Sequence, residues 1–146
     1  MSKTWYSSAD EIDALGERLL AQRLPKREWT HAGHFAAALW LLRTRGFDAT
    51  ARDMPDIIRA HNLSVGGANT DTEGYHETIT QASIRAARSV LDAHAPDAPL
   101  HKVANALMNG EFGASSWPLW YWSQPVLFSV EARRAWVEPD VKPLPF

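Results

Sequence analysis

The spacing of apolar residues along the chain is typical of amphipathic helices. Ile12, Leu15 and Leu19 recur three and four positions apart, which brings their side chains onto one helical face. Pro25 disfavours helical geometry in the residue before it, so this first helix should end just ahead of the proline. Strictly alternating apolar and polar residues, which indicate strands, are nearly absent. The sequence therefore predicts an all-α protein.

Capping and turn residues divide the rest of the chain into further helices. Proline fits the first turn of a helix, and glycine fits the position just after the last turn. A Ser or Thr followed three residues later by Glu forms a capping box, as at residues 8–11 and 70–73. Asp53 is a further candidate cap. These signals predict helices over residues 9–24, 25–45, 54–62, 70–94 and 98–109, and a short helical piece at 130–136.

The C-terminal part of the chain has a different pattern. Beyond Gly113 the helical periodicity fades, and the late prolines imply an extended tail over the surface. Three tryptophans crowd one short segment, Trp117, Trp120 and Trp122. With no internal repeat and no linker, we expect a single helical domain over residues 1–146. The expected architecture is a compact bundle of four to five helices with an extended Trp/Pro-rich C-terminal segment.

Composition narrows the classes of function. A chain of 146 residues is long enough to bury a core, and its formal net charge of -2 gives no electrostatic reason to expect nucleic acid or a membrane surface as partner. The absence of cysteine excludes disulfides and thiolate metal sites. Together with a polar N-terminus and the lack of any apolar run of about 20 residues, this favours a cytoplasmic protein. The sequence leaves open whether the protein forms a homo-oligomer.

Ionisable residues fall on the apolar stripe of the second expected helix. Glu28 and His31 share the helical bearing of Phe35 and Leu39, and His34 lies on the flank of that stripe. A group that could carry charge must be paired, ligated or neutral on a buried face, because burying an isolated charge is costly. This part of the helix is therefore a candidate site.

The fourth expected helix gives a similar result from a separate part of the chain. His76 shares the bearing of the apolar residues Ile79 and Val90, and Thr80 and Ser83 continue a polar strip along that inner face. Two histidines from different helices are thus predicted to point inward. If the two helix ends meet, the imidazoles form one site.

Metal binding is the chemistry that fits this set best. Imidazole and carboxylate suit Zn, Fe, Mn, Ni or Cu, and helical bundles build such sites from Glu-x-x-His pairs. We therefore expect a divalent metal held by Glu28, His31 and His76, with Glu77 or His34 as the acid or base. The enzyme would act on a small organic substrate as a hydrolase, lyase or oxidoreductase. No glycine fingerprint for a nucleotide cofactor appears.

Two other hypotheses fit the same residues. In a metal-free binding module the histidines and the tryptophan segment would enclose a small ligand, whereas in an interaction protein the polar core would only fix the packing. Glu28 could instead interact with the helix dipole, and Thr80 and Ser83 could bond back to the preceding turn. His61, near a helix end, is expected to be a capping or surface residue.

Three segments resemble those of a family of small, largely uncharacterised bacterial proteins: Glu-Trp-Thr-His-Ala-Gly-His at 28–34, Asn-Thr-Asp-Thr-Glu-Gly-Tyr-His-Glu-Thr at 69–78, and Glu-Ala-Arg-Arg-Ala-Trp-Val-Glu-Pro-Asp at 131–140. Two positions depart from that family, since His61 stands where tyrosine is usual and Gln124 where arginine is usual. The resemblance implies one compact domain and no established reaction. It marks as functional His31, His34, Asn69, His76 and Glu77. We expect the ligand contacts to be Asn69, Thr80 and Trp120.

Overall fold

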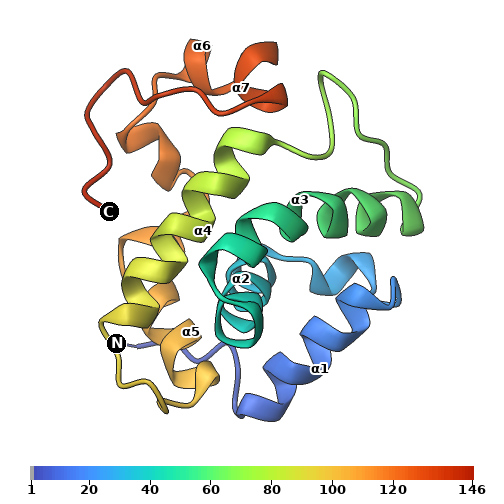
Figure 1. Ribbon diagram of the computed structural model, residues 1–146, viewed down its shortest axis with the longest axis vertical. Coiled ribbons are helices and arrows are strands. Elements are labelled where there is room, and N and C mark those ends of the chain that lie inside the picture. The colour runs from blue at the N-terminus through green and yellow to red at the C-terminus, as the bar shows by residue number, and fades with distance from the viewer. Residues whose placement is uncertain (1) are drawn as a thin grey trace.

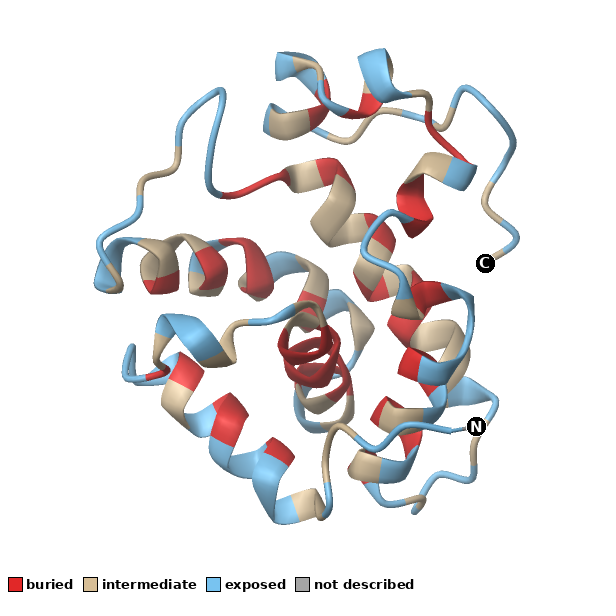
Figure 2. Cartoon of the chain, turned by 180° about the vertical axis from the view of Figure 1, so that it is seen from behind, coloured by how far each residue is buried: buried red, intermediate tan, exposed pale blue. Residues whose placement is uncertain are grey.

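The architecture is organised around one helix, α2 (His31–Arg45), that is apolar on nearly every side. From Ala32 to Leu42 only His34 and Trp40 keep partial exposure to solvent. A helix of this kind must be covered all round. In the computed structural model, which describes residues 2–146, four other helices pack against it, and Figures 1 and 2 show it buried at the centre.

The described chain is all-helical, as the sequence predicts. The helices that surround α2 are α1 (Ala9–Leu20), α3 (Phe47–Ser64), α4 (Glu77–Asp92) and α5 (Leu100–Asn109). The remaining elements are short: η1 (Lys26–Glu28), η2 (Glu111–Gly113), η3 (Trp117–Trp120), α6 (Gln124–Leu127) and α7 (Val130–Arg134). No strand occurs within residues 2–146. None of the helices in that range combines the length and apolar character needed to cross a bilayer.

The contact between α1 and α2 shows how closely the helices approach. The predicted stripe of Ile12, Leu15 and Leu19 is buried on this side of α1. Gly16 lies beside the indole of Trp40, so closely that a Cβ at this position would be 2.3 Å from the ring. The absence of a side chain at Gly16 therefore lets the indole lie against the backbone of α1.

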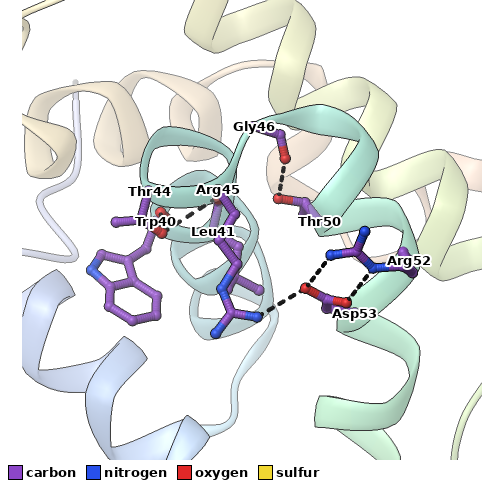
Figure 3. Close-up of polar contacts among 8 residues, drawn as sticks. All are labelled: Trp40, Leu41, Thr44, Arg45, Gly46, Thr50, Arg52 and Asp53. Carbon is purple, nitrogen blue, oxygen red and sulfur yellow. Dashed lines mark hydrogen bonds and ion pairs between the residues drawn. The ribbon is translucent and has the colours of Figure 1, made fainter.

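The corner between α2 and α3 differs from the prediction (Figure 3). Gly46 adopts a φ of 83°, and the Thr50 hydroxyl donates a hydrogen bond of 2.7 Å to its carbonyl. Because the turn needs only this one glycine, α3 begins at Phe47 rather than at residue 54. Asp53 does not cap a helix; its carboxylate accepts hydrogen bonds from Arg45 and Arg52.

Other helix boundaries also differ from the prediction. The first helix is expected over 9–24, but α1 ends at Leu20, and Gln22 just beyond it has a φ of 57°. The expected helix over 25–45 is interrupted after η1, and α2 begins only where Thr30 caps it, its Oγ1 accepting from the Gly33 N–H at 3.0 Å. The expected helix over 70–94 begins at Glu77. Thr70 instead closes a turn by accepting from the Glu73 N–H at 3.2 Å. The signal at Thr70 is thus a real local bond, but it closes a turn and does not begin a helix. At residues 8–11 α1 begins as predicted, although the Ser8 side chain forms no capping bond among residues 2–146.

The C-terminal segment covers one end of the bundle, beside α4 (Figure 1). Trp117 and Trp122 are buried, and the last residue, Phe146, packs edge-on against Phe112 with ring centroids 5.3 Å apart. Trp120 is 63 % exposed. The tryptophan segment thus seals the core with two of its three indoles.

The Gly16 contact yields a test of the fold. Gly16→Ala should lower the free energy of unfolding by about 1–3 kcal/mol, because the new methyl group forces the Trp40 indole out of its place. Urea denaturation followed by circular dichroism measures this change. Gly110→Ala is the matched control, since the nearest atom to its Cβ would be 3.4 Å away. If the two substitutions lowered the free energy of unfolding equally, the close contact of Gly16 with the Trp40 indole would not be the cause.

Candidate functional site

A cavity of about 290 Å³ lies between the first turns of α2 and α4 and the C-terminal segment. Two histidines of α2 and two serines from other elements supply its polar groups, and aromatic and aliphatic side chains form the rest of the wall. The lining residues are His31, His34, Phe35, Ile79, Ser83, Ser115, Trp117 and Pro118.

His31 is the first residue of α2, and a distant backbone group fixes its ring. Its Nε2 lies 2.7 Å from the carbonyl oxygen of Phe112. A carbonyl only accepts hydrogen bonds, so Nε2 carries the proton and donates it. In the neutral imidazole the other ring nitrogen, Nδ1, then keeps a lone pair, for which no partner occurs among residues 2–146. The ring also packs edge-on against Phe35, with centroids 5.2 Å apart.

His34 is held in the same way, one turn further along α2. Its Nδ1 donates to the carbonyl of Thr30 at 2.7 Å, which leaves the lone pair of Nε2 free. The ring stacks on Trp29 with centroids 3.7 Å apart. Burial lowers the pKa of His34 to about 4, so the imidazole is neutral at neutral pH. Both histidines of the cavity thus combine one anchored N–H with one free acceptor.

His76 has a different role, because both of its ring nitrogens are engaged. It is the N-cap residue of α4, where Nδ1 accepts from the Ile79 N–H at 3.2 Å. Nε2 donates to the carbonyl of Leu127 at 2.7 Å. Burial lowers the pKa of His76, which keeps the ring neutral. His76 therefore joins α4 to the C-terminal segment and has no lone pair left for a metal.

The Glu28 carboxylate also binds a partner outside the cavity. Glu28 lies in η1, outside α2, and its carboxylate binds the Arg18 guanidinium through two hydrogen bonds of 2.8 and 3.0 Å. The bond to Arg18 lowers the pKa of this carboxyl group. The structure does not bring the expected ligands Glu28, His31 and His76 together. Within residues 2–146, no three His, Asp or Glu side chains are arranged to hold a metal ion.

The other predicted site residues lie outside the cavity. Asn69 uses its amide to fasten the loop before α4: Oδ1 accepts from the Tyr75 N–H at 3.1 Å, and Nδ2 donates to a backbone carbonyl of α3. The Glu77 carboxylate accepts a hydrogen bond from the Tyr75 hydroxyl. Thr80 is partly buried on α4 and is not part of the cavity wall, and Trp120 lies at the surface.

Sequence reasoning missed His61, which is fully buried rather than a surface or capping residue. Neither of its ring nitrogens has a hydrogen-bond partner in the described part of the chain, residues 2–146. The sequence contains a signal for this burial. Ile58 follows Met54 after four positions and His61 follows Ile58 after three, so the three side chains share the buried face of α3. Trp117, rather than Trp120, is the indole that the cavity uses.

Fold and site together define an all-α protein with a small cavity that carries two anchored histidines. Comparisons of the chain with protein-family models, with curated proteins and with solved structures give no match. The arguments for its function therefore depend on the geometry of the site.

The two bonds of His76 predict how variants behave. His76→Ala should lower the free energy of unfolding by about 2 kcal/mol, roughly one for the lost cap and one for the lost bond to Leu127. His76→Asn keeps a capping oxygen and should recover about half of the loss. Urea denaturation of both variants measures the difference. Equal stability of His76→Ala and the parent protein would contradict the structural role.

The low pKa of His34 predicts a dependence of stability on pH. At pH values between about 4 and 6.5, the ordinary pKa of histidine, His34 binds a proton in the unfolded chain but not in the folded protein. The free energy of unfolding should therefore be highest above about pH 6.5 and fall as the pH drops towards 4. The slope should be smaller in His34→Gln, as measured by urea denaturation at a series of pH values. An unchanged slope would show that His34 titrates normally.

Proposed function

We propose that this protein binds a small organic molecule in the cavity between α2 and α4, with His31 and His34 as hydrogen-bond acceptors. The observation that carries the proposal is the anchoring of both imidazoles. Each ring donates an N–H to a backbone carbonyl, at 2.7 Å in both cases, so in the neutral form each has a lone pair for a ligand. Fixed acceptors of this kind orient a ligand without the entropic cost of ordering the side chain.

The remaining wall defines the kind of ligand. Phe35, Ile79 and Trp117 offer an apolar surface, and the hydroxyl groups of Ser83 and Ser115 can donate or accept. A volume of about 290 Å³ is at the small end of the range for ligand pockets. The ligand is accordingly a compact molecule with an apolar body and one or two hydroxyl or amine donors.

The pKa of His34 favours recognition over proton transfer. A general base works best when its pKa is near the operating pH. With a pKa of about 4, His34 is a weak base at neutral pH, although its lone pair is always available to accept a hydrogen bond. These properties support the metal-free binding module more strongly than an acid–base enzyme.

A screen with matched variants tests the binding proposal. The probes are small alcohols, phenols and aliphatic amines, detected by ligand-observed NMR. His34→Phe keeps the ring but removes the acceptor, and should weaken the binding of a hit about tenfold, the effect of one hydrogen bond. His94→Phe is the control, because His94 makes the same bond to the carbonyl four residues earlier but lies outside this cavity.

The affinities of the parent protein and the two variants decide whether the ligand binds in this cavity. Weaker binding in His34→Phe, with an unchanged affinity in His94→Phe, supports the assignment of the cavity. Equal affinity in all three proteins would place any bound probe elsewhere and remove the basis of the proposal.

A metal-dependent enzyme is a second candidate, with a narrower ligand set than the sequence suggests. Histidines that bind metals usually donate their other N–H to a backbone carbonyl or carboxylate, as His31 and His34 do. Water or substrate would have to complete the coordination. Calorimetric titration with Zn²⁺ tests this candidate: binding should be lost in His34→Phe and retained in His76→Asn. If the parent protein binds no Zn²⁺, the metal candidate fails and the binding module is unaffected.

A further inference from the structure

A second cavity, of about 310 Å³, has no lining residue in common with the His31–His34 pocket. It is formed by η1, by the last turns of α3 and by the loop before α4. Trp29 contributes to its wall and also packs against both His34 and His61, with centroid distances of 3.7 and 5.1 Å. The two cavities therefore have different lining residues, but Trp29, which lines this one, packs against a histidine of the other.

His61 is the feature of this cavity that points to a ligand. It contributes to the wall, it is 0 % exposed, and neither ring nitrogen has a hydrogen-bond partner among residues 2–146. Proteins seldom bury a polar group in this way, because an unsatisfied donor or acceptor is costly. A ligand that supplies a hydrogen-bond partner would remove this cost on binding.

Charged groups of both signs are available in the same wall. Lys26 comes from η1 and Glu73 from the loop, and neither forms a salt bridge with any residue of the described chain. Asn62 donates its Nδ2 to Asn69 at 2.9 Å, and its Oδ1 has no hydrogen-bond donor among residues 2–146. The wall of the cavity thus includes a positively charged side chain and a negatively charged one, each without a salt bridge in the described chain, and an amide oxygen that can accept a hydrogen bond.

We propose that this cavity binds a small zwitterion of the free amino-acid class. Lys26 and the N–H of His61 bind its carboxylate, and Glu73 and the Oδ1 of Asn62 bind its ammonium group. Its side chain packs against the indole of Trp29. Opposite charges in one wall favour a ligand that carries both, because a ligand with a single charge would leave one protein group unpaired.

The loop is built to lie close to α3 and still leave room for a ligand. Gly67 approaches the carbonyl of Asn62 so closely that a Cβ would be 2.9 Å away, and Gly74 adopts a φ of 82°. Asn69 ties the middle of the loop to α3. The nitrogens of His61 are covered in the free protein, so the ligand reaches them through a small displacement of this loop or of the Trp29 indole.

NMR of ¹⁵N-labelled protein tests this proposal directly. The standard L-amino acids are titrated one at a time at millimolar concentration. At least one should cause saturable shifts of the Trp29 indole N–H and the Gly67 amide. Its affinity should fall at least about tenfold in His61→Phe and in Lys26→Met. Lys102→Met, which removes an exposed lysine elsewhere, is the control and should bind normally.

Matched analogues test the class of ligand. The amine and the carboxylic acid that share the carbon skeleton of the best amino acid each lack one charge, and each should bind at least about tenfold more weakly. If His61→Phe does not fold, Lys26→Met and Glu73→Gln alter exposed positions and keep the test possible. The proposal is overturned if no amino acid shifts these two resonances, if the variants bind as the parent does, or if one single-charge analogue binds equally well.

Discussion

The burial of α2 is the constraint on which the rest of the structure depends. Its middle is a run of small and large apolar residues, Ala36 to Leu39, all of them at most 1 % exposed. Since no face of this helix can be left in water, α1, α3, α4 and α5 each bury a stripe against it. The position of the candidate site follows from this arrangement. The first turn of α2 lies where α4 and the C-terminal segment also meet, and this turn carries His31 and His34.

Hydrogen-bond capacity separates the histidines into different roles. A neutral imidazole has one donor and one acceptor. His76 uses both within the protein, so it holds the C-terminal segment to α4, with Thr78 beside it bonding to the carbonyl of Ala135. His31 and His34 each use only the donor, and His61 uses neither. The last three therefore have unused capacity, and all three line cavities.

Trp29 connects these observations. It occupies the two-residue break between η1 and α2, and its indole packs between the rings of His34 and His61. The break directs Glu28 away from α2, to Arg18, and turns the indole towards the bundle. One interruption of helical structure thus removes the expected carboxylate ligand and sets an indole that lines one cavity against a histidine of the other.

The sequence by itself determined the helical class, the buried stripe of α1 and the end of α5 at Asn109, because these depend on periodicity and on turn residues that act over a few positions. It also placed His76 inside, where it is 8 % exposed. Only the tertiary structure decided what each imidazole does. The partners of His31 and His76 are the carbonyls of Phe112 and Leu127, 81 and 51 residues away. Local spacing gives the direction of a side chain along its own helix, whereas the group that meets it is set by the packing of distant segments.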